Sequence, residues 1–149
     1  MAQTQVAQVD PPMPRQKFLN KLDRADLPAR TKQSLELSLR AFFSGYDDDG
    51  DDPTRIDPNA RSLDRLLEFL SHPYHRLWVP PALSINGQGM FAAVWNEPDV
   101  YRWVLEFHPD GDIEETYLEL DTDRGVTDTS RKSRVGDTVW PPFPEAKIR

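Results

Sequence analysis

The sequence contains no cysteine, which excludes disulfide bonds and thiolate metal sites. It has no apolar run near the ~20 residues that a membrane-spanning helix requires. Its Gln-rich start also lacks the apolar region of a signal peptide. We therefore expect a cytoplasmic protein without membrane contact, although the mean hydropathy of −0.67 is low for a compact domain.

Motifs that carry catalytic or metal chemistry are also scarce. There is no Gly-x-Ser-x-Gly elbow, and the segment 87–89 is too short for a phosphate-binding loop. Counted from Asp47, the acidic run 47–52 places Gly50 fourth and Pro58 twelfth, whereas a calcium loop requires Gly sixth and Glu twelfth. We predict no cofactor, no metal site and no enzymatic activity. Weak metal binding at Asp47 to Asp52 and an enzyme of unrecognised type remain alternatives.

The three histidines are weak candidates for metal ligands. His72 and His75 are three residues apart, but Pro73 disfavours the helical turn that would align them, and no third ligand is near in sequence. We interpret this pair as structural or exposed. His108 precedes a Pro-Asp-Gly turn and is assigned to that turn.

Apolar periodicity divides the chain into segments. A single α+β domain is predicted over 15–123, with helices over 15–24, from Pro28 to about Gly45, and around the leucines of 63–70. An acidic linker is expected at 47–57 and a disordered arm at 1–14. The proline-rich segment 124–149 is predicted to be irregular, and its Trp140–Pro144 end either binds as a polyproline ligand or folds back onto the body.

Residues 82–120 indicate four short strands joined by Gly, Pro and Asn turns. In the third strand Tyr101, Trp103, Leu105 and Phe107 alternate with more polar positions, as in a sheet with one covered side. The acidic fourth segment is typical of an exposed edge. The predicted fold is α+β, with two to three N-terminal helices on one face of a three- to four-stranded antiparallel meander.

Charge is unevenly distributed along the chain. The net charge is −7, and residues 41–123 carry eighteen acidic side chains against five arginines, whereas the last 26 residues are basic. Aromatic side chains at a sheet surface are frequent interface anchors, but most large aromatics are core residues, and both readings stay open here. The leading hypothesis is a protein-binding surface for a basic partner, formed by Trp95, Tyr101, Trp103, Glu114, Glu115 and Glu119.

A nucleic-acid-binding helix is the alternative. Arg30, Lys32 and Arg40 lie on the clearest predicted helix and are able to meet phosphates. The negative net charge makes nucleic acid an improbable partner, and a solvated helix face explains these residues equally simply.

Two segments resemble a pattern in short, uncharacterised bacterial proteins. They are Pro81-Ala-Leu-Ser-Ile-Asn-Gly-Gln-Gly-Met-Phe-Ala-Ala-Val-Trp95 and Leu105-Glu-Phe-His-Pro-Asp-Gly111, and the resemblance covers about residues 61–118. Proteins of this group look like accessory proteins of mobile or defence-associated gene neighbourhoods. The resemblance implies the strand and turn arrangement, and it implies a small regulatory or antitoxin-like accessory protein with no catalytic residues.

Overall fold

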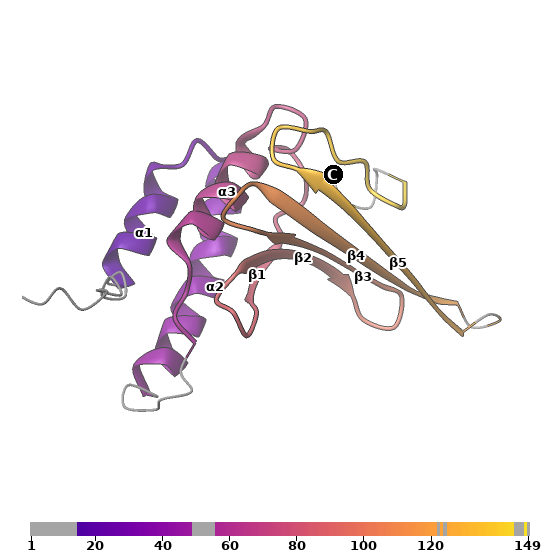
Figure 1. The fold of residues 1–149 in the computed structure, drawn as a ribbon, viewed down its shortest axis with the longest axis horizontal. Helices are drawn as coiled ribbons and strands as arrows, with labels where there is room; N and C mark the ends of the chain where they lie inside the picture. The colour runs from indigo at the N-terminus through magenta and orange to yellow at the C-terminus, as the bar shows by residue number, and fades with distance from the viewer. Residues whose placement is uncertain (1–14, 49–55, 122, 124, 145–147, 149) are drawn as a thin grey trace, which may run out of the picture.

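The computed structural model describes residues 15–48, 56–121, 123, 125–144 and 148. Three helices precede five antiparallel strands that pair in chain order (Figure 1). The elements are α1 (Arg15–Arg24), α2 (Ala29–Asp48), α3 (Ala60–Ser71), β1 (Ala82–Ile85), β2 (Phe91–Glu97), β3 (Tyr101–Phe107), β4 (Asp112–Asp121) and β5 (Gly125–Arg134). The predicted α+β class is confirmed, with five strands in place of three to four.

The helices form where the apolar stripes predict them. In α1 the buried residues are Phe18, Leu19 and Leu22. The side chain of Asn59 caps α3 by accepting the backbone N–H of Ser62 at 3.0 Å. Helix α2 runs past Gly45 to residue 48, so the acidic run begins as helix, whereas 49–55 and the predicted arm 1–14 lie outside the described residues.

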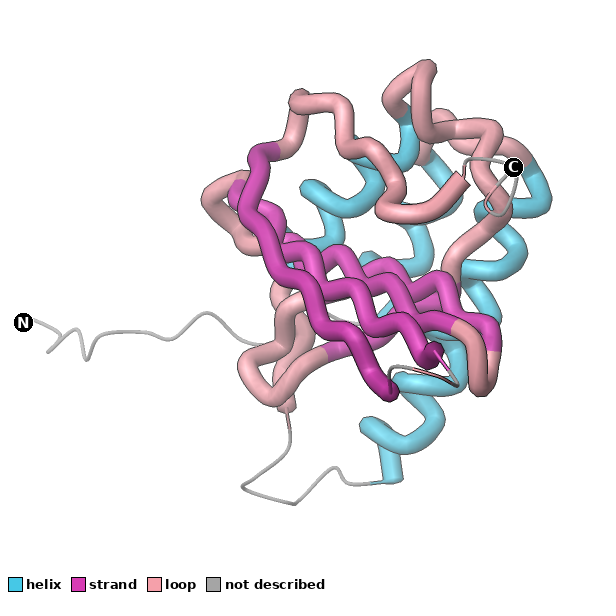
Figure 2. Tube along the Cα trace, turned by 90° about the vertical axis from the view of Figure 1, so that its right-hand side faces the viewer, coloured by secondary structure: helices cyan, strands magenta, loops and turns pink. Residues whose placement is uncertain are grey.

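The helices lie on one side of the sheet (Figure 2). This inner face carries the predicted aromatic row, and Trp95 of β2 is directly opposite Trp103 of β3, with ring centroids 4.7 Å apart. Alternation therefore places the intervening residues on the opposite, outer face. The buried core combines the inner row with the helix stripes, and it includes Phe18, Leu35, Leu39, Phe43, Leu63, Leu66, Leu70, Phe91, Leu105, Phe107 and Ile113.

Strand β5 corrects the prediction for the C-terminal segment. Residues 125–134, expected to be irregular, pair with β4 over its full length, so β4 is an interior strand and not the exposed edge. The side chains of β5 are nearly all exposed, which explains why no apolar alternation marks the strand in the sequence. Cross-strand charge pairs mark it instead, since Arg131 is opposite Glu115 and Arg134 is opposite Asp112.

The two edges of the sheet differ. Helix α2 covers the edge at β1, where the hydroxyl of Ser38 accepts the N–H of Leu83 at 3.1 Å and that of Ser34 donates to the carbonyl of Pro81 at 3.0 Å. At the other edge β5 has β4 as its only partner within the described part of the chain. Lysine and arginine along β5 are the usual protection of such an edge.

Described residues beyond β5 also pack against the folded body. Val139, Phe143 and Ile148 are buried in the core cluster. The ring of Phe143 lies 4.6 Å from that of Tyr101 and 5.6 Å from that of Trp103. Trp140 remains 60% exposed and stacks edge-on against Tyr74. Part of the proline-rich end therefore folds back onto the inner face.

Within the described residues no helix is both long enough and apolar enough to cross a membrane.

Candidate functional site

The predicted partner-binding aromatics lie mainly in the core. Trp95 is 3% exposed and Trp103 is fully buried, while Tyr101 is half-buried under Phe143. The indole of Trp95 donates to the carbonyl of Val79 at 2.7 Å. The two tryptophans therefore offer no accessible contact area to a partner.

Glu115 is likewise buried, at 5% exposure. Its carboxylate accepts a hydrogen bond from the indole Nε1 of Trp103 at 3.0 Å and another from the guanidinium of Arg131 at 3.0 Å. The same guanidinium donates to the carbonyl of Trp140, which fastens the C-terminal segment to the sheet. Glu115 therefore forms an ion pair with Arg131 that stabilises the fold, and its carboxylate is not exposed to a partner.

The acidic side chains of β4 lie beside basic side chains of β5 in the same chain. Arg134 of β5 pairs with Asp112 of β4 at 2.6 Å, and Lys132 stands directly opposite Glu114. Because Glu114 is on the outer face and Glu115 on the inner face, the predicted acids do not share one surface. The six predicted residues are therefore not brought together.

Two of them, Tyr101 and Glu119, do meet at one end of the sheet. They contribute to an open hollow of about 260 Å³ between the β2–β3 turn and the far end of β4 and β5, here called the distal hollow. Its apolar lining comes from Val100, Leu118, Leu120 and Val126. Three of these are exposed for aliphatic side chains, Val100 at 37%, Leu120 at 43% and Val126 at 66%.

The distal hollow is negatively charged. Glu97, Asp99 and Glu119 line it beside a single Arg102, and these three carboxylates form no ion pair with another described residue. Burial and the charge of Glu97 raise the pKa of Tyr101, and burial followed by the nearby Glu119 raises the pKa of Tyr117 to about 12. The two tyrosines therefore stay neutral beside the carboxylates at physiological pH.

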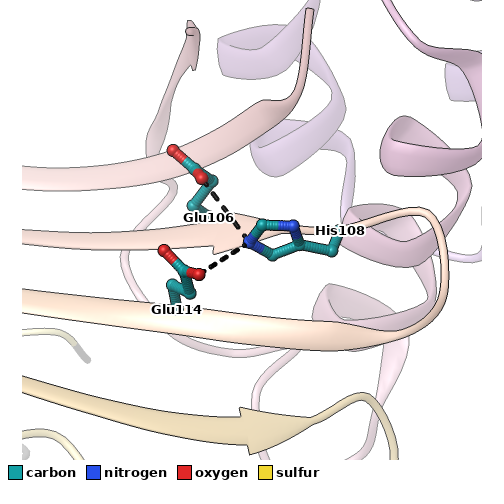
Figure 3. A group of neighbouring side chains, drawn as sticks. All are labelled: Glu106, His108 and Glu114. Atoms are coloured by element: carbon teal, nitrogen blue, oxygen red, sulfur yellow. Dashed lines mark ion pairs between the residues drawn. The ribbon is translucent and has the colours of Figure 1, made fainter. Parts of the chain in front are cut away.

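A second cluster lies at the opposite end of the outer face. Glu106 of β3 and Glu114 of β4 are cross-strand partners, and His108 follows in the turn between them (Figure 3). Its Nε2 lies 3.3 Å from a carboxylate oxygen of Glu114 and 3.6 Å from one of Glu106. Period-two alternation and the short turn put these three residues on one side, a signal that our assignment of His108 to turn formation overlooked.

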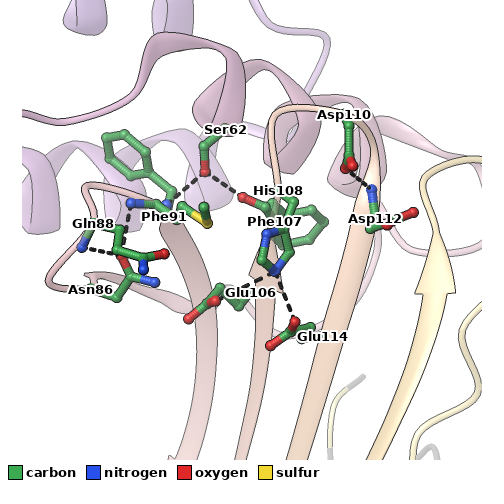
Figure 4. Close-up of polar contacts among 11 residues, drawn as sticks. Ser62, Asn86, Gln88, Phe91, Glu106, Phe107, His108, Asp110, Asp112 and Glu114 are labelled. Atoms are coloured by element: carbon green, nitrogen blue, oxygen red, sulfur yellow. Dashed lines mark hydrogen bonds and ion pairs between the residues drawn. The ribbon is translucent and has the colours of Figure 1, made fainter.

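Helix α3 holds this end of the sheet in place. The buried hydroxyl of Ser62 donates to the carbonyl of Phe107 at 2.6 Å and accepts the N–H of Phe91 at 2.7 Å (Figure 4). Within the turn the carboxylate of Asp110 accepts the N–H of Asp112 at 2.9 Å. Strands β2 and β3 are thereby fixed relative to the helix, and the guanidinium of Arg65 attaches the turn to it by donating to the carbonyl of Pro109 at 3.2 Å.

The alternative nucleic-acid residues each have a partner within the protein. Arg30 donates to the carbonyl of Leu77 at 2.9 Å, and Lys32 to the carbonyl of Asp23 at 2.6 Å. Arg40 forms an ion pair with Glu36 one turn earlier at 2.8 Å. These contacts fit the description of a solvated helix face with local partners.

The remaining histidines serve the fold. His72 Nδ1 accepts the N–H of Tyr74 at 3.1 Å. His75 is 1% exposed, stacks on Phe69 and has its Nδ1 3.0 Å from the carbonyl of that residue. Burial above all, with the charge of His72 added, lowers the pKa of His75 to about 4 although the Phe69 carbonyl acts in the opposite direction.

Comparisons with protein families, with curated proteins and with solved structures found no match to this chain.

Proposed function

We propose that this is a small, non-enzymatic binding protein that holds a protein partner at the distal hollow. The observation that carries the proposal is the gathering of Val100, Leu120 and Val126, all exposed, beside three carboxylates that form no ion pair with another described residue. Exposed aliphatic side chains at one spot mark interaction surfaces more often than scattered ones do. A regulatory or accessory role in the cytoplasm, of the antitoxin-like kind suggested by the sequence resemblance, agrees with such a surface.

The chemistry of the hollow defines the partner. An apolar lining together with Glu97, Asp99 and Glu119 complements an apolar side chain flanked by lysine or arginine. The partner is therefore a basic protein surface, as the sequence predicts, but it meets a different set of residues from the one predicted. Solvent-exposed charges such as these carboxylates contribute chiefly to the rate of association and make that rate dependent on salt.

Site-specific photocrosslinking tests the proposal. A benzophenone amino acid at position 126, in the full chain, is irradiated in soluble extract of the source organism at about 0.05 M and about 0.5 M NaCl. We expect one protein to be crosslinked at low salt and lost in the double variant Val100→Ser/Leu120→Ser. The same capture is expected to persist in Leu37→Ser/Leu77→Ser, because these aliphatic side chains, 66% and 64% exposed, lie outside the hollow.

Charge variants provide a second readout. Glu97→Gln/Glu119→Gln is expected to weaken capture at low salt, whereas Asp23→Asn on α1 leaves it unchanged. Crosslinking that is identical in the hollow variants and in both controls would show that the hollow does not select a partner, and would overturn the proposal.

A further inference from the structure

The cluster at the β3–β4 turn brings together three side chains that are able to bind a metal. One side-chain ligand atom from each of Glu106, His108 and Glu114 lies within 4.8 Å of the other two. One imidazole nitrogen and two carboxylates are the donors that divalent transition metals accept, whereas calcium and magnesium prefer oxygen alone. We propose that these three residues bind a divalent transition-metal cation, with Zn²⁺ as the best fit.

The spacing of the donor atoms agrees with direct coordination. Zinc bonds to nitrogen and oxygen of ~2.0 to 2.2 Å at tetrahedral angles separate two donors by ~3.3 to 3.6 Å. The Nε2 of His108 is 3.3 Å from the Glu114 oxygen and 3.6 Å from the Glu106 oxygen (Figure 3). A cation can therefore be held between these atoms with little movement of the backbone.

Two features of the cluster remain unexplained by the protein alone. The Nε2 atom of His108 is buried and makes no hydrogen bond to any described residue, because its contacts with the two carboxylates lack hydrogen-bond geometry. In addition, Glu106 and Glu114 are like charges placed directly opposite each other on neighbouring strands, an arrangement that destabilises a sheet. A cation between them would satisfy the nitrogen and neutralise both carboxylates.

The charged neighbours of the cluster provide only part of this compensation. Lys132 of β5 stands opposite Glu114 on the far side, while the partner of Glu106 on β2 is the uncharged Ala92. The cluster lies on the outer face, away from the helices, so a fourth coordination position is open to water or to a group on another molecule. The site is separate from the distal hollow and does not depend on the function proposed for it.

Zinc titration of the full chain, freed of metal by chelator and dialysis, tests the proposal. Calorimetry with ZnCl₂ is expected to show one equivalent bound, with MgCl₂ as the comparison cation. His108→Gln and Glu114→Gln should each weaken zinc binding at least tenfold. His72→Gln is the matched control, since His72 lies outside the cluster, and it should bind zinc like the wild-type chain.

A stability readout covers the case in which a variant binds weakly because it folds poorly. One equivalent of zinc should raise the melting temperature of the wild-type chain and leave that of Glu106→Gln unchanged. Glu106→Gln should melt no lower than the wild type without metal, because it removes a like-charge contact. Zinc binding that survives unaltered in His108→Gln places the cation elsewhere, for instance at the acidic run 47–52, and overturns the proposal, as does the absence of zinc binding.

Discussion

The indole Nε1 of Trp103 donates a hydrogen bond to Glu115 Oε2 at 3.0 Å within the buried space between the inner face and the C-terminal segment. Trp103 thus packs as a hydrophobic core residue while its single polar atom is satisfied by a carboxylate on the next strand. Arg131 supplies the compensating positive charge from β5. The contacts of Glu115 with Trp103 and Arg131 connect β3, β4 and β5. The hydrogen bond from Arg131 to the carbonyl of Trp140 extends this connection to the C-terminal segment.

Removing the charge on either side of this ion pair is therefore expected to have unequal effects. Arg131→Met leaves a buried carboxylate unpaired and should lower the free energy of unfolding by about 3 kcal/mol. Glu115→Gln keeps an acceptor for the indole and should cost about 1 kcal/mol, since Arg131 is half exposed and retains water. Urea denaturation of both variants measures the difference, and equal losses would contradict this account.

The hydroxyl of Ser62 is expected to matter more than an ordinary helix serine. Ser62→Ala leaves the N–H of Phe91 and the carbonyl of Phe107 without their buried partner, and should cost about 2 kcal/mol. Ser71→Ala at the end of the same helix removes an exposed local hydrogen bond, and should cost less than about 0.5 kcal/mol. Thermal and urea unfolding of the two variants compare them, and similar losses would show that the bridge does not stabilise the sheet.

The depressed pKa of His75 predicts acid sensitivity. Its pKa rises from about 4 in the folded protein to the usual 6.5 on unfolding, so the unfolded chain binds the extra proton between these values. Stability from this residue is complete above pH 6.5 and is lost as the pH falls toward 4, by about 3 kcal/mol in total.

Unfolding at pH 7 and at pH 4 tests this assignment with two variants. His75→Gln should lose less stability between the two pH values than the wild-type chain, by about 3 kcal/mol. His72→Gln should keep most of the wild-type dependence, because burial is the main cause of the low pKa of His75 and the charge of His72 is the smallest one. The same pH dependence in all three would assign the acid sensitivity to other groups.

The folded-back C-terminal segment predicts a contrast between two of its aromatics. Phe143→Ala removes a buried ring from contact with Tyr101, Trp103 and Tyr117, and should cost about 3 kcal/mol. Trp140→Ala removes a ring that is 60% exposed, and should cost less than about 1 kcal/mol. Circular dichroism at increasing urea concentration measures both. A small loss for Phe143→Ala would mean that the segment contributes little to the core.

Local patterns predict the helices and the first four strands because each of these elements buries a repeating apolar set. The stripe that includes Leu35 and Leu39, and the alternation through Trp103 and Phe107, are such sets. Strand β5 buries almost nothing, so the sequence pattern contains no comparable signal for it. The candidate sites were harder to predict, since only pairing in space shows that Glu106 and Glu114 are neighbours.

What the sequence determined by itself was the class of fold, the order of the helices and the first four strands, and which face of β2 and β3 is covered, because burial depends on periods of 3.6 and 2.0 residues. Only the tertiary structure determined which charged side chains become neighbours. The acidic strand and the basic C-terminal residues lie in separate parts of the sequence, yet the antiparallel pairing of β4 and β5 brings them side by side, and Arg131 and Arg134 pair with Glu115 and Asp112. Electrostatic pairing depends on distance across strands, and that distance is set only when the chain folds.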